Sequence, residues 1–197
     1  MQTGHYHVYN RGAHKALLFN SPDDYRRFVC LLHIGNTAKP FHFSQINESK
    51  IFLTEREDML VEIISYCLMP NHFHIVLREI EKGSKAKFLQ KICTAYVMYY
   101  NIKYKHSGTI FKGTYLSKEI CDENYLKTVI NYVHLNPYGI YKPNLSSDVY
   151  SEPEHIEAAI AYSKGYEFSS FKDYLGEIRQ QNVILTPRFD LAGLIRG

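Results

Sequence analysis

Two histidines separated by one residue, His72 and His74, are the first side chains in this sequence whose type and spacing could do chemistry. They lie in a β-prone segment, HFHIVLR, and side chains alternate along a strand, so both imidazoles project from one face. Two imidazoles on a stiff face can hold one divalent metal ion. The sequence has ten histidines, and His5 and His7 repeat the same spacing. The spacing alone therefore does not decide which pair binds metal.

A second pair of functional side chains, Tyr132 and Asn136, lies four residues apart at the end of a predicted helix over residues 123–135. This spacing places both on one side of the helix, about one turn apart. The apolar stripe of that helix consists of Leu126, Val129, Ile130 and Val133. Tyr132 lies beside the stripe, where it can reach a site between helix and sheet. The chain has seventeen tyrosines, and most must be packing or surface residues, so position alone does not select this one.

The elements that must position these side chains follow from periodicity and from turn and capping residues. Strands are predicted over residues 5–11, 59–68, 72–78 and 114–120. The second and third form a hairpin around a Pro-Asn turn. Residues 37–58 are predicted to form a loop that contains a short strand at 50–54. Helices are predicted from a cap at Ser21 or Asp23 to about Asn36, over 85–105, over 123–135 after a cap at Asp122, and over 151–164.

The order strand, helix, hairpin, helix, strand, helix favours an α+β fold. A single ferredoxin-like antiparallel sheet with helices packed on it accommodates that order. The composition changes after Tyr141-Lys142-Pro143. We therefore predict a main domain over residues 1–145 and a C-terminal helical extension or tail over 146–197.

The composition is that of a globular protein, with 45% hydrophobic and 14% aromatic residues. No apolar run approaches the ~20 residues that a membrane-spanning helix needs, and the N-terminal residues do not resemble an export signal. The four cysteines are far apart and form no CxxC pair, which favours free thiols in a reducing compartment over a zinc knuckle. We expect a cytoplasmic protein with no membrane partner.

Charge is distributed unevenly along the chain, although the net charge is only +3. Residues 82–118 hold eight lysines and no acidic residue, a one-sign block that indicates a polyanionic partner. A solvated helix face is the alternative interpretation. Tyrosines interleaved with these lysines suit unpaired bases, which stack on aromatic rings beside phosphates. They are Tyr96, Tyr99, Tyr100, Tyr104 and Tyr115.

Two motifs connect these observations to a known family. Residues 66–74, YCLMPNHFH, resemble the YCLMPNHxH signature of the REP-associated tyrosine transposases, a branch of the HUH single-strand nucleases. Residues 132–137, YVHLNP, resemble the YIHLNP motif of the same family. Asn10-Arg11-Gly12, GTIFKGTY at 108–115 and FSSFKDYL at 168–175 match further landmarks in the same order. The resemblance extends to about residue 176, and it identifies the predicted main domain as an HUH tyrosine transposase catalytic domain.

The resemblance implies a role for each residue of the two motifs. His72 and His74 match the metal ligands, Asn136 matches the third protein ligand, and Tyr132 matches the nucleophile. The metal would be Mg²⁺ or Mn²⁺. Attack by the tyrosine gives a 5′-phosphotyrosine and a free 3′-hydroxyl, and a second 3′-hydroxyl can reverse the link to complete strand transfer. By the same alignment His5 and His7 are structural or DNA-contacting residues and not ligands.

The expected partner is single-stranded DNA with hairpin or palindromic structure. We predict phosphate contacts by Arg11, Lys85, Lys87, Lys91, Lys105, Lys112 and Lys118. Thr114 stands where family members often carry a basic residue, which puts one phosphate contact in doubt. Related insertion-sequence transposases are dimers that exchange the tyrosine helix, whereas REP-associated members are thought to act as monomers, so both states stay open. A non-cleaving, single-stranded nucleic-acid-binding domain of the same fold is the alternative function. The presence of all four motif side chains favours catalysis.

Overall fold

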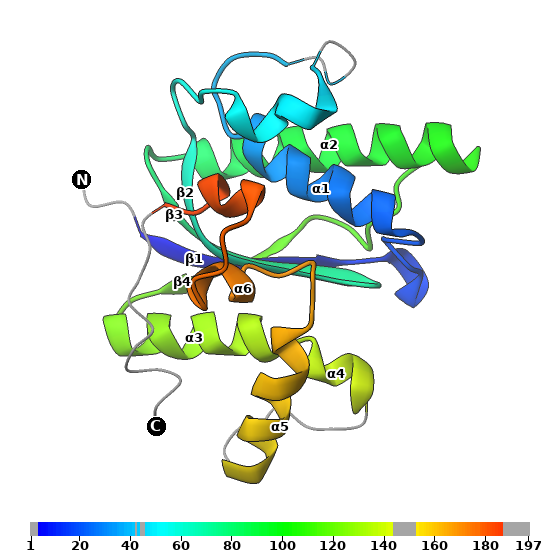
Figure 1. Ribbon diagram of the computed structural model, residues 1–197. Helices are drawn as coiled ribbons and strands as arrows, with labels where there is room; N and C mark the ends of the chain where they lie inside the picture. Colours follow the sequence, from blue (N-terminus) through cyan, green and yellow to red (C-terminus); the bar gives the residue numbers. More distant parts are fainter. Residues whose placement is uncertain (1–3, 42, 44–45, 144–152, 187–197) are drawn as a thin grey trace.

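The computed structural model describes residues 4–41, 43, 46–143 and 153–186 (Figure 1). Its strands are β1 (His5–Arg11), β2 (Val61–Met69), β3 (His72–Glu79) and β4 (Leu116–Ile120). Its α-helices are α1 (Pro22–Ile34), α2 (Ser84–Tyr104), α3 (Glu123–Leu135), α4 (Tyr138–Tyr141), α5 (Pro153–Lys164) and α6 (Phe171–Tyr174). Short 3₁₀ helices are η1 (Ala13–Lys15), η3 (Glu48–Leu53) and η5 (Gln180–Ile184).

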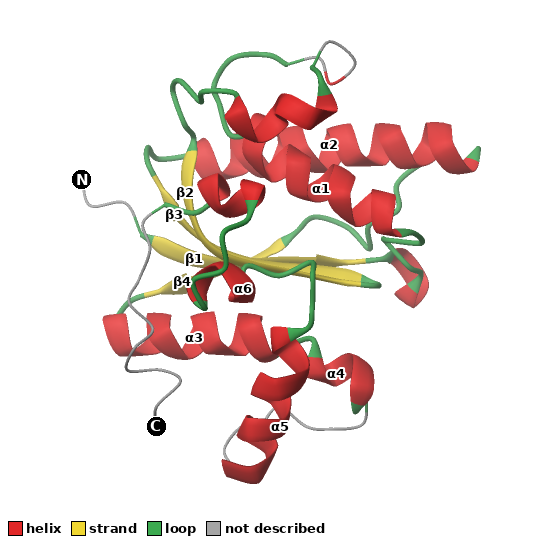
Figure 2. Cartoon of the chain, in the orientation of Figure 1, coloured by secondary structure: helices red, strands yellow, loops and turns green. Residues whose placement is uncertain are grey.

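The four strands form one antiparallel sheet in the order β2-β3-β1-β4. Helices α1 and α2 cover one face of the sheet, and α3 covers the other (Figures 1 and 2). With α1 between β1 and β2, and α2 between β3 and β4, this is the ferredoxin-like arrangement. The predicted fold class is confirmed, with helices α5 and α6 following the sheet domain.

Local sequence signals explain the elements that matter for the site. A two-residue turn, Pro70-Asn71, joins β2 to β3, and Met69 pairs with His72 directly across it. The Asp122 side chain caps α3 by accepting a hydrogen bond of 2.7 Å from the backbone N–H of Tyr125. The helix ends at Leu135, just before Pro137, because proline cannot supply the backbone N–H that another turn requires.

Each face of the sheet has its own hydrophobic core. The larger core lies under α1 and α2 and includes Val8, Phe28, Phe73, Leu77, Phe88 and Ile92. The smaller core lies under α3 and includes Ile64, Cys67, Val76, Ile120, Val129 and Val133. Burial on both faces fixes the strand register, because a slip of one residue would send the side chains of a strand to the wrong core.

The strand predicted over residues 50–54 is wrong, because Glu48–Leu53 forms a 3₁₀ helix instead. Ile51 is fully buried in the larger core, whereas Leu53 is exposed. Backbone hydrogen bonds run from Lys50 N to Asn47 O and from Thr54 N to Ile51 O, so this segment is bonded to itself. The β-prone composition was overridden by a local turn that inserts one side chain into the core.

The described part of the predicted C-terminal extension contacts the outer edge of the sheet. Leu68 N donates to Phe168 O and Ser170 N donates to Tyr66 O, both at 2.9 Å, which covers part of the free edge of β2. The predicted boundary at residue 145 lies outside the described residues, and the division into two domains stays a prediction. In the described part of the chain, every helix is too short or too polar to span a bilayer.

Candidate functional site

His72 and His74 lie at the beginning of β3, directly after the turn, and both face α3. Phe73 between them points to the opposite face, where it is fully buried in the larger core. The two imidazole centroids are 5.0 Å apart. The strand alternation expected from HFHIVLR therefore places both imidazoles on the same side of the sheet.

Helix α3 brings Tyr132 and Asn136 to the same place. The Tyr132 ring stands almost perpendicular to that of His74, with 5.5 Å between ring centroids. Asn136, at the C-terminal end of α3, has its Oδ1 atom 3.2 Å from Nε2 of His72. The structure thus brings together the four motif side chains, two from a strand and two from one helix.

His7 is a member of this cluster that the sequence reasoning missed as a site residue. Its Nε2 atom lies 2.9 Å from Nδ1 of His74, and the two ring planes differ by only 24°, with centroids 5.1 Å apart. The Tyr132 ring also meets His7 edge-on at 5.9 Å. The alternation of HYHVYNR indicated that His7 and Tyr9 share a face. That this face lies beside His74 depends on the pairing of β1 with β3, which no local pattern encodes.

The hydrogen bonds of His72 select its tautomer. Its Nδ1 atom lies 2.7 Å from Oδ1 of Asn71, an atom that can only accept, so Nδ1 carries the proton. Nε2 then presents a lone pair to Oδ1 of Asn136, which is also an acceptor. Two acceptors facing each other at this distance repel unless a cation or a proton is shared between them.

Burial keeps the site neutral. It lowers the pKa of His72. The Asn136 oxygen opposes this shift, because it can accept a hydrogen bond from the protonated ring, and the charge of Arg11 adds a small further lowering. Burial, and then the neighbouring His72 and His7, hold the pKa of His74 well below its ordinary value. The pKa of His7 falls to about 4 through burial and the nearby Lys118. Unprotonated imidazoles are the form that binds metal.

The same burial raises the pKa of the Tyr132 phenol, a shift that its hydrogen bond with Asn136 opposes. The phenol is therefore protonated at neutral pH. A tyrosine in this state is a weak nucleophile, so its target would have to be activated by another group in the site.

The donor set fits a divalent cation. Among the described residues, no three His, Cys, Asp or Glu side chains are grouped to hold a metal. The amide oxygen of Asn136, 3.2 Å from Nε2 of His72, could serve as a third donor. Imidazole nitrogen suits Mn²⁺ better than Mg²⁺, which prefers oxygen. All three donors are neutral, so a bound ion would keep its full charge for an anionic substrate.

A groove of about 940 Å³ opens beside His72. It is lined by Tyr9, Asn10, Arg11, Lys15, Asn71, His72, Lys112, Gly113, Thr114, Leu116 and Pro143. Gly12 N donates a hydrogen bond of 2.8 Å to Asn71 O, which ties the end of β1 to the hairpin turn. A Cβ atom at Gly12 would lie 2.0 Å from Ala16 O, so only glycine fits there. Arg11 and Lys112 of the predicted DNA contacts thus lie next to the histidine cluster.

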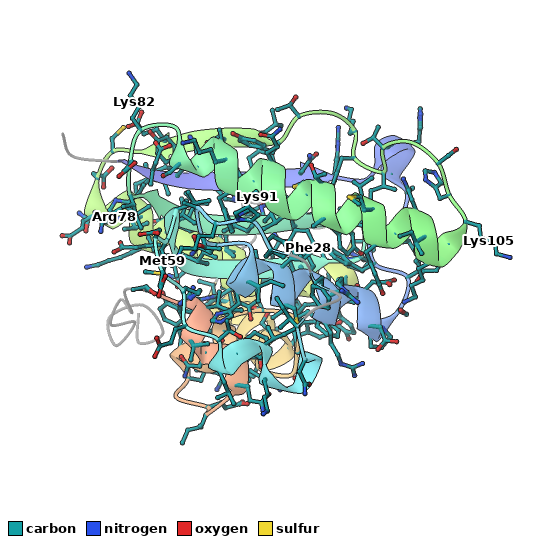
Figure 3. All side chains as sticks on the ribbon, turned by 90° about the horizontal axis from the view of Figure 1, so that it is seen from above. Phe28, Met59, Arg78, Lys82, Lys91 and Lys105 are labelled. Carbon is teal, nitrogen blue, oxygen red and sulfur yellow. The ribbon has the colours of Figure 1, made fainter. Side chains whose placement is uncertain are left out.

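Among the other predicted DNA contacts, Lys118 lies on the site face. It is on β4 across from His7, and its Nζ atom is 5.0 Å from the Tyr125 ring centroid on α3. The remaining four belong to α2 or to its C-terminal cap, and Figure 3 labels Lys91 and Lys105 on this helix. Helix α2 covers the face of the sheet opposite α3, away from the histidines (Figure 1).

These four lysines have different surroundings. Nζ of Lys91 donates to the carbonyls of Thr37 and Lys39, and Nζ of Lys85 lies 3.1 Å from Ser117 Oγ. Lys87 and Lys105 are exposed. The structure does not bring this group to the histidine cluster, and its role in DNA binding stays a prediction.

The chain is similar to known proteins in sequence and in fold. The family described as "Transposase IS200 like" matches residues 44–136. This range contains β2, β3, α2, β4 and α3 with all four motif side chains, and it leaves out β1. No curated protein sequence is significantly similar to the chain.

Among solved structures, the chain is similar to a REP-associated tyrosine transposase bound to a REP hairpin. The TM-score is 0.56 at 11% sequence identity, and the match covers 92% of this chain and 86% of the other. At this identity the likeness shows a shared fold alone. Residues 44–136 are thus similar in sequence to the IS200-like transposases, and the chain has the fold of a REP-associated tyrosine transposase.

Proposed function

We propose that this protein cleaves and rejoins single-stranded DNA through a covalent link to Tyr132. The observation that carries the proposal is the meeting of the Tyr132 ring with His74, at 5.5 Å, beside the pair His72 Nε2 and Asn136 Oδ1. A phenol, two neutral imidazoles and an amide oxygen at one point make a set that a domain selected for binding alone does not need.

The proposed ligands are Nε2 of His72, Nε2 of His74 and Oδ1 of Asn136. A divalent ion held there, Mn²⁺ or Mg²⁺, supplies a positive charge that polarises the scissile phosphate and stabilises the leaving 3′-oxygen. The family match supports such a cofactor, and the facing acceptors of His72 and Asn136 support its binding between them.

The residues of the chain do the remaining work. Contacts with His7 and His74 hold the Tyr132 ring, so its oxygen is presented from a fixed direction. The phenol gives up its proton to water as its oxygen bonds to phosphorus, and the leaving 3′-oxygen takes up a proton in turn. The bond from phosphorus to the 3′-oxygen breaks, which leaves a 5′-phosphotyrosine and a free 3′-hydroxyl. The link conserves the phosphodiester, so another 3′-hydroxyl can reverse the step and complete strand transfer.

The proposed substrate is hairpin-forming single-stranded DNA. The solved relative is bound to a REP hairpin, and the groove beside His72 carries Arg11, Lys15 and Lys112 at its border. Guanidinium and ammonium groups at such a border attract a phosphate backbone approaching the histidines. All four motif side chains come from one chain, which supports a monomer as sufficient for the chemistry.

The test uses labelled hairpin single strands from the flanks of the gene, incubated with the protein with and without Mn²⁺. We expect a metal-dependent protein–DNA adduct that survives denaturant. Tyr132→Phe should abolish the adduct and leave DNA binding nearly unchanged, because only the nucleophilic oxygen is removed.

Tyr9→Phe is the matched control, because the Tyr9 ring also lies close to His74, at 5.6 Å. This variant should still form the adduct. Adduct formation by Tyr132→Phe would assign the nucleophile to another tyrosine. Hairpin binding by the wild type without any adduct would favour the non-cleaving function.

A further inference from the structure

His7 is a buried histidine outside the two sequence motifs, and it contacts the His74 ring of the cluster. It lies on β1, which precedes the range matched by the transposase family, and it is 9% exposed. Its Nε2 atom is 2.9 Å from Nδ1 of His74, which is itself only 6% exposed. Two buried imidazoles at this distance share one proton between facing nitrogens, so the contact fixes a tautomer as well as a position.

The geometry points to His7 as the positioning residue of His74: it accepts the Nδ1 proton of His74 and so directs the Nε2 lone pair of that ring toward the metal. This inference rests on the proposed function, because it concerns a ligand of the same site. It adds a residue that the motif does not contain and gives it a role distinct from metal binding.

His7 is a neighbour of a ligand and not itself a ligand. The two nitrogens of an imidazole point away from each other, and His7 occupies the Nδ1 side of His74. With its Nε2 atom engaged there, His7 would not serve as a ligand of a metal held at Nε2 of His74. The two ring planes differ by 24° and their centroids are 5.1 Å apart, so the contact between the nitrogens lies near the plane of both rings and restricts rotation of His74.

The two histidine ligands then have equivalent support from different residues. Asn71 accepts the Nδ1 proton of His72 at 2.7 Å, and His7 accepts that of His74 at 2.9 Å. Such outer partners orient a metal-binding histidine and make it a better donor, and removing one typically weakens metal affinity about 10- to 100-fold. His7 is therefore expected to affect metal binding before it affects any step of the reaction.

The experiment measures Mn²⁺ affinity without DNA, by the electron paramagnetic resonance signal of the free ion. Wild type is compared with His7→Leu, which fills the space but cannot accept a proton, and with His7→Gln, whose side-chain amide can. His5→Leu is the control, because His5 lies two residues earlier on the same strand face. His72→Ala reports loss of a proposed ligand.

We expect His7→Leu to weaken Mn²⁺ binding about 10- to 100-fold. His7→Gln should restore most of the affinity, and His5→Leu should bind as wild type does. Wild-type affinity in His7→Leu, alongside a lost site in His72→Ala, would overturn the role of His7 and leave the proposed function intact. Wild type that does not bind Mn²⁺ would overturn both. A lower melting temperature of His7→Leu with unchanged affinity would show a purely structural role.

Nitrogen NMR of the wild-type protein tests the same inference without any substitution. With labelled histidine, the ring of His74 should carry its proton on Nδ1 in the metal-free protein. Mn²⁺-free samples are required, and diamagnetic Mg²⁺ or Zn²⁺ can then be added to shift the Nε2 resonance. A proton found on Nε2 of His74 would overturn the proposal even if the variants fail to fold.

Discussion

The two faces of the sheet treat buried polar groups in opposite ways. Under α1 and α2, the Asp24 carboxylate is fully buried and accepts five hydrogen bonds, from the backbone of Asn20 and Ser21 and from Tyr99, Lys103 and Tyr104. Under α3, the acceptors of His72 and Asn136 face each other. The hydrogen bonds of the Asp24 carboxylate connect α1 to α2, whereas two facing acceptors are stabilised when a cation binds between them. The buried polar group on the face with the larger core therefore contributes to stability, whereas the facing acceptors on the other face form the proposed cation site.

The largest expected effect that tests this contrast is on the site face. His72→Ala removes one proposed ligand, and we expect DNA cleavage at limiting Mn²⁺ to be lost. The free energy of unfolding should change little, because the side chain lies at the end of the sheet beside an open groove. Adduct assays and denaturant titration of the same sample measure both quantities. Retained cleavage would mean that the facing acceptors serve another purpose.

The second prediction concerns the opposite face. Asp24→Asn should leave adduct formation unchanged but lower the free energy of unfolding by about 2–3 kcal/mol, because charged hydrogen bonds to a buried group are lost. Asp23→Asn is the control, since the ion pair of Asp23 with Arg26 is exposed, and its effect should be much smaller.

The dependence of stability on pH follows from the same carboxylate. Burial raises the pKa of Asp24, but hydrogen bonds from Lys103, Tyr104 and Tyr99 outweigh burial and lower it to about 2. An unfolded aspartate titrates near ~3.9. The folded pKa is the lower one, so the stabilisation is present above about pH 4 and is lost as the pH falls toward about 2. Asp24→Asn should show a shallower loss of stability across that window, and an unchanged profile would exclude this carboxylate as its source.

The smallest expected effect is on the salt dependence of DNA binding. It is tested by comparing two lysines from the lysine block at residues 82–118. Lys112 lies at the groove beside His72, so Lys112→Ala should reduce the slope of DNA affinity against salt concentration by about one. Lys91→Ala should change the slope less, because its ammonium group is engaged with two backbone carbonyls on the other face. Equal changes would mean that the DNA path extends across both faces, as the charge block predicts.

The sequence predicted those parts of the fold that local signals encode. The β2-β3 hairpin follows from its Pro-Asn turn, and α3 follows from the Asp122 cap and the apolar stripe, so the spacing of Tyr132 and Asn136 on one side of that helix could be anticipated. The 3₁₀ helix at Glu48–Leu53 was missed because burial of Ile51 decided the conformation, and composition did not.

The parts that were missed depend on contacts between distant segments. His7 and His74 are 67 residues apart, and they meet because β1 inserts beside β3. The sequence shows eight lysines in one block but not where their charges go. Lys103 lies 2.7 Å from the Asp24 carboxylate, so one of these charges is used inside the protein. Tertiary contacts determine both arrangements, and local sequence periodicity predicts neither of them.

Helix α3 carries the proposed nucleophile and one proposed ligand a single turn apart, so the two side chains move together. If this helix moved outward with a DNA strand attached to Tyr132, it would carry the Asn136 oxygen away from the histidines in the same movement. The DNA end attached to Tyr132 would then leave the site at the same time as the proposed metal site lost its Asn136 ligand. Once the attached DNA strand had moved away, the proposed metal site would be incomplete and could not act on another strand.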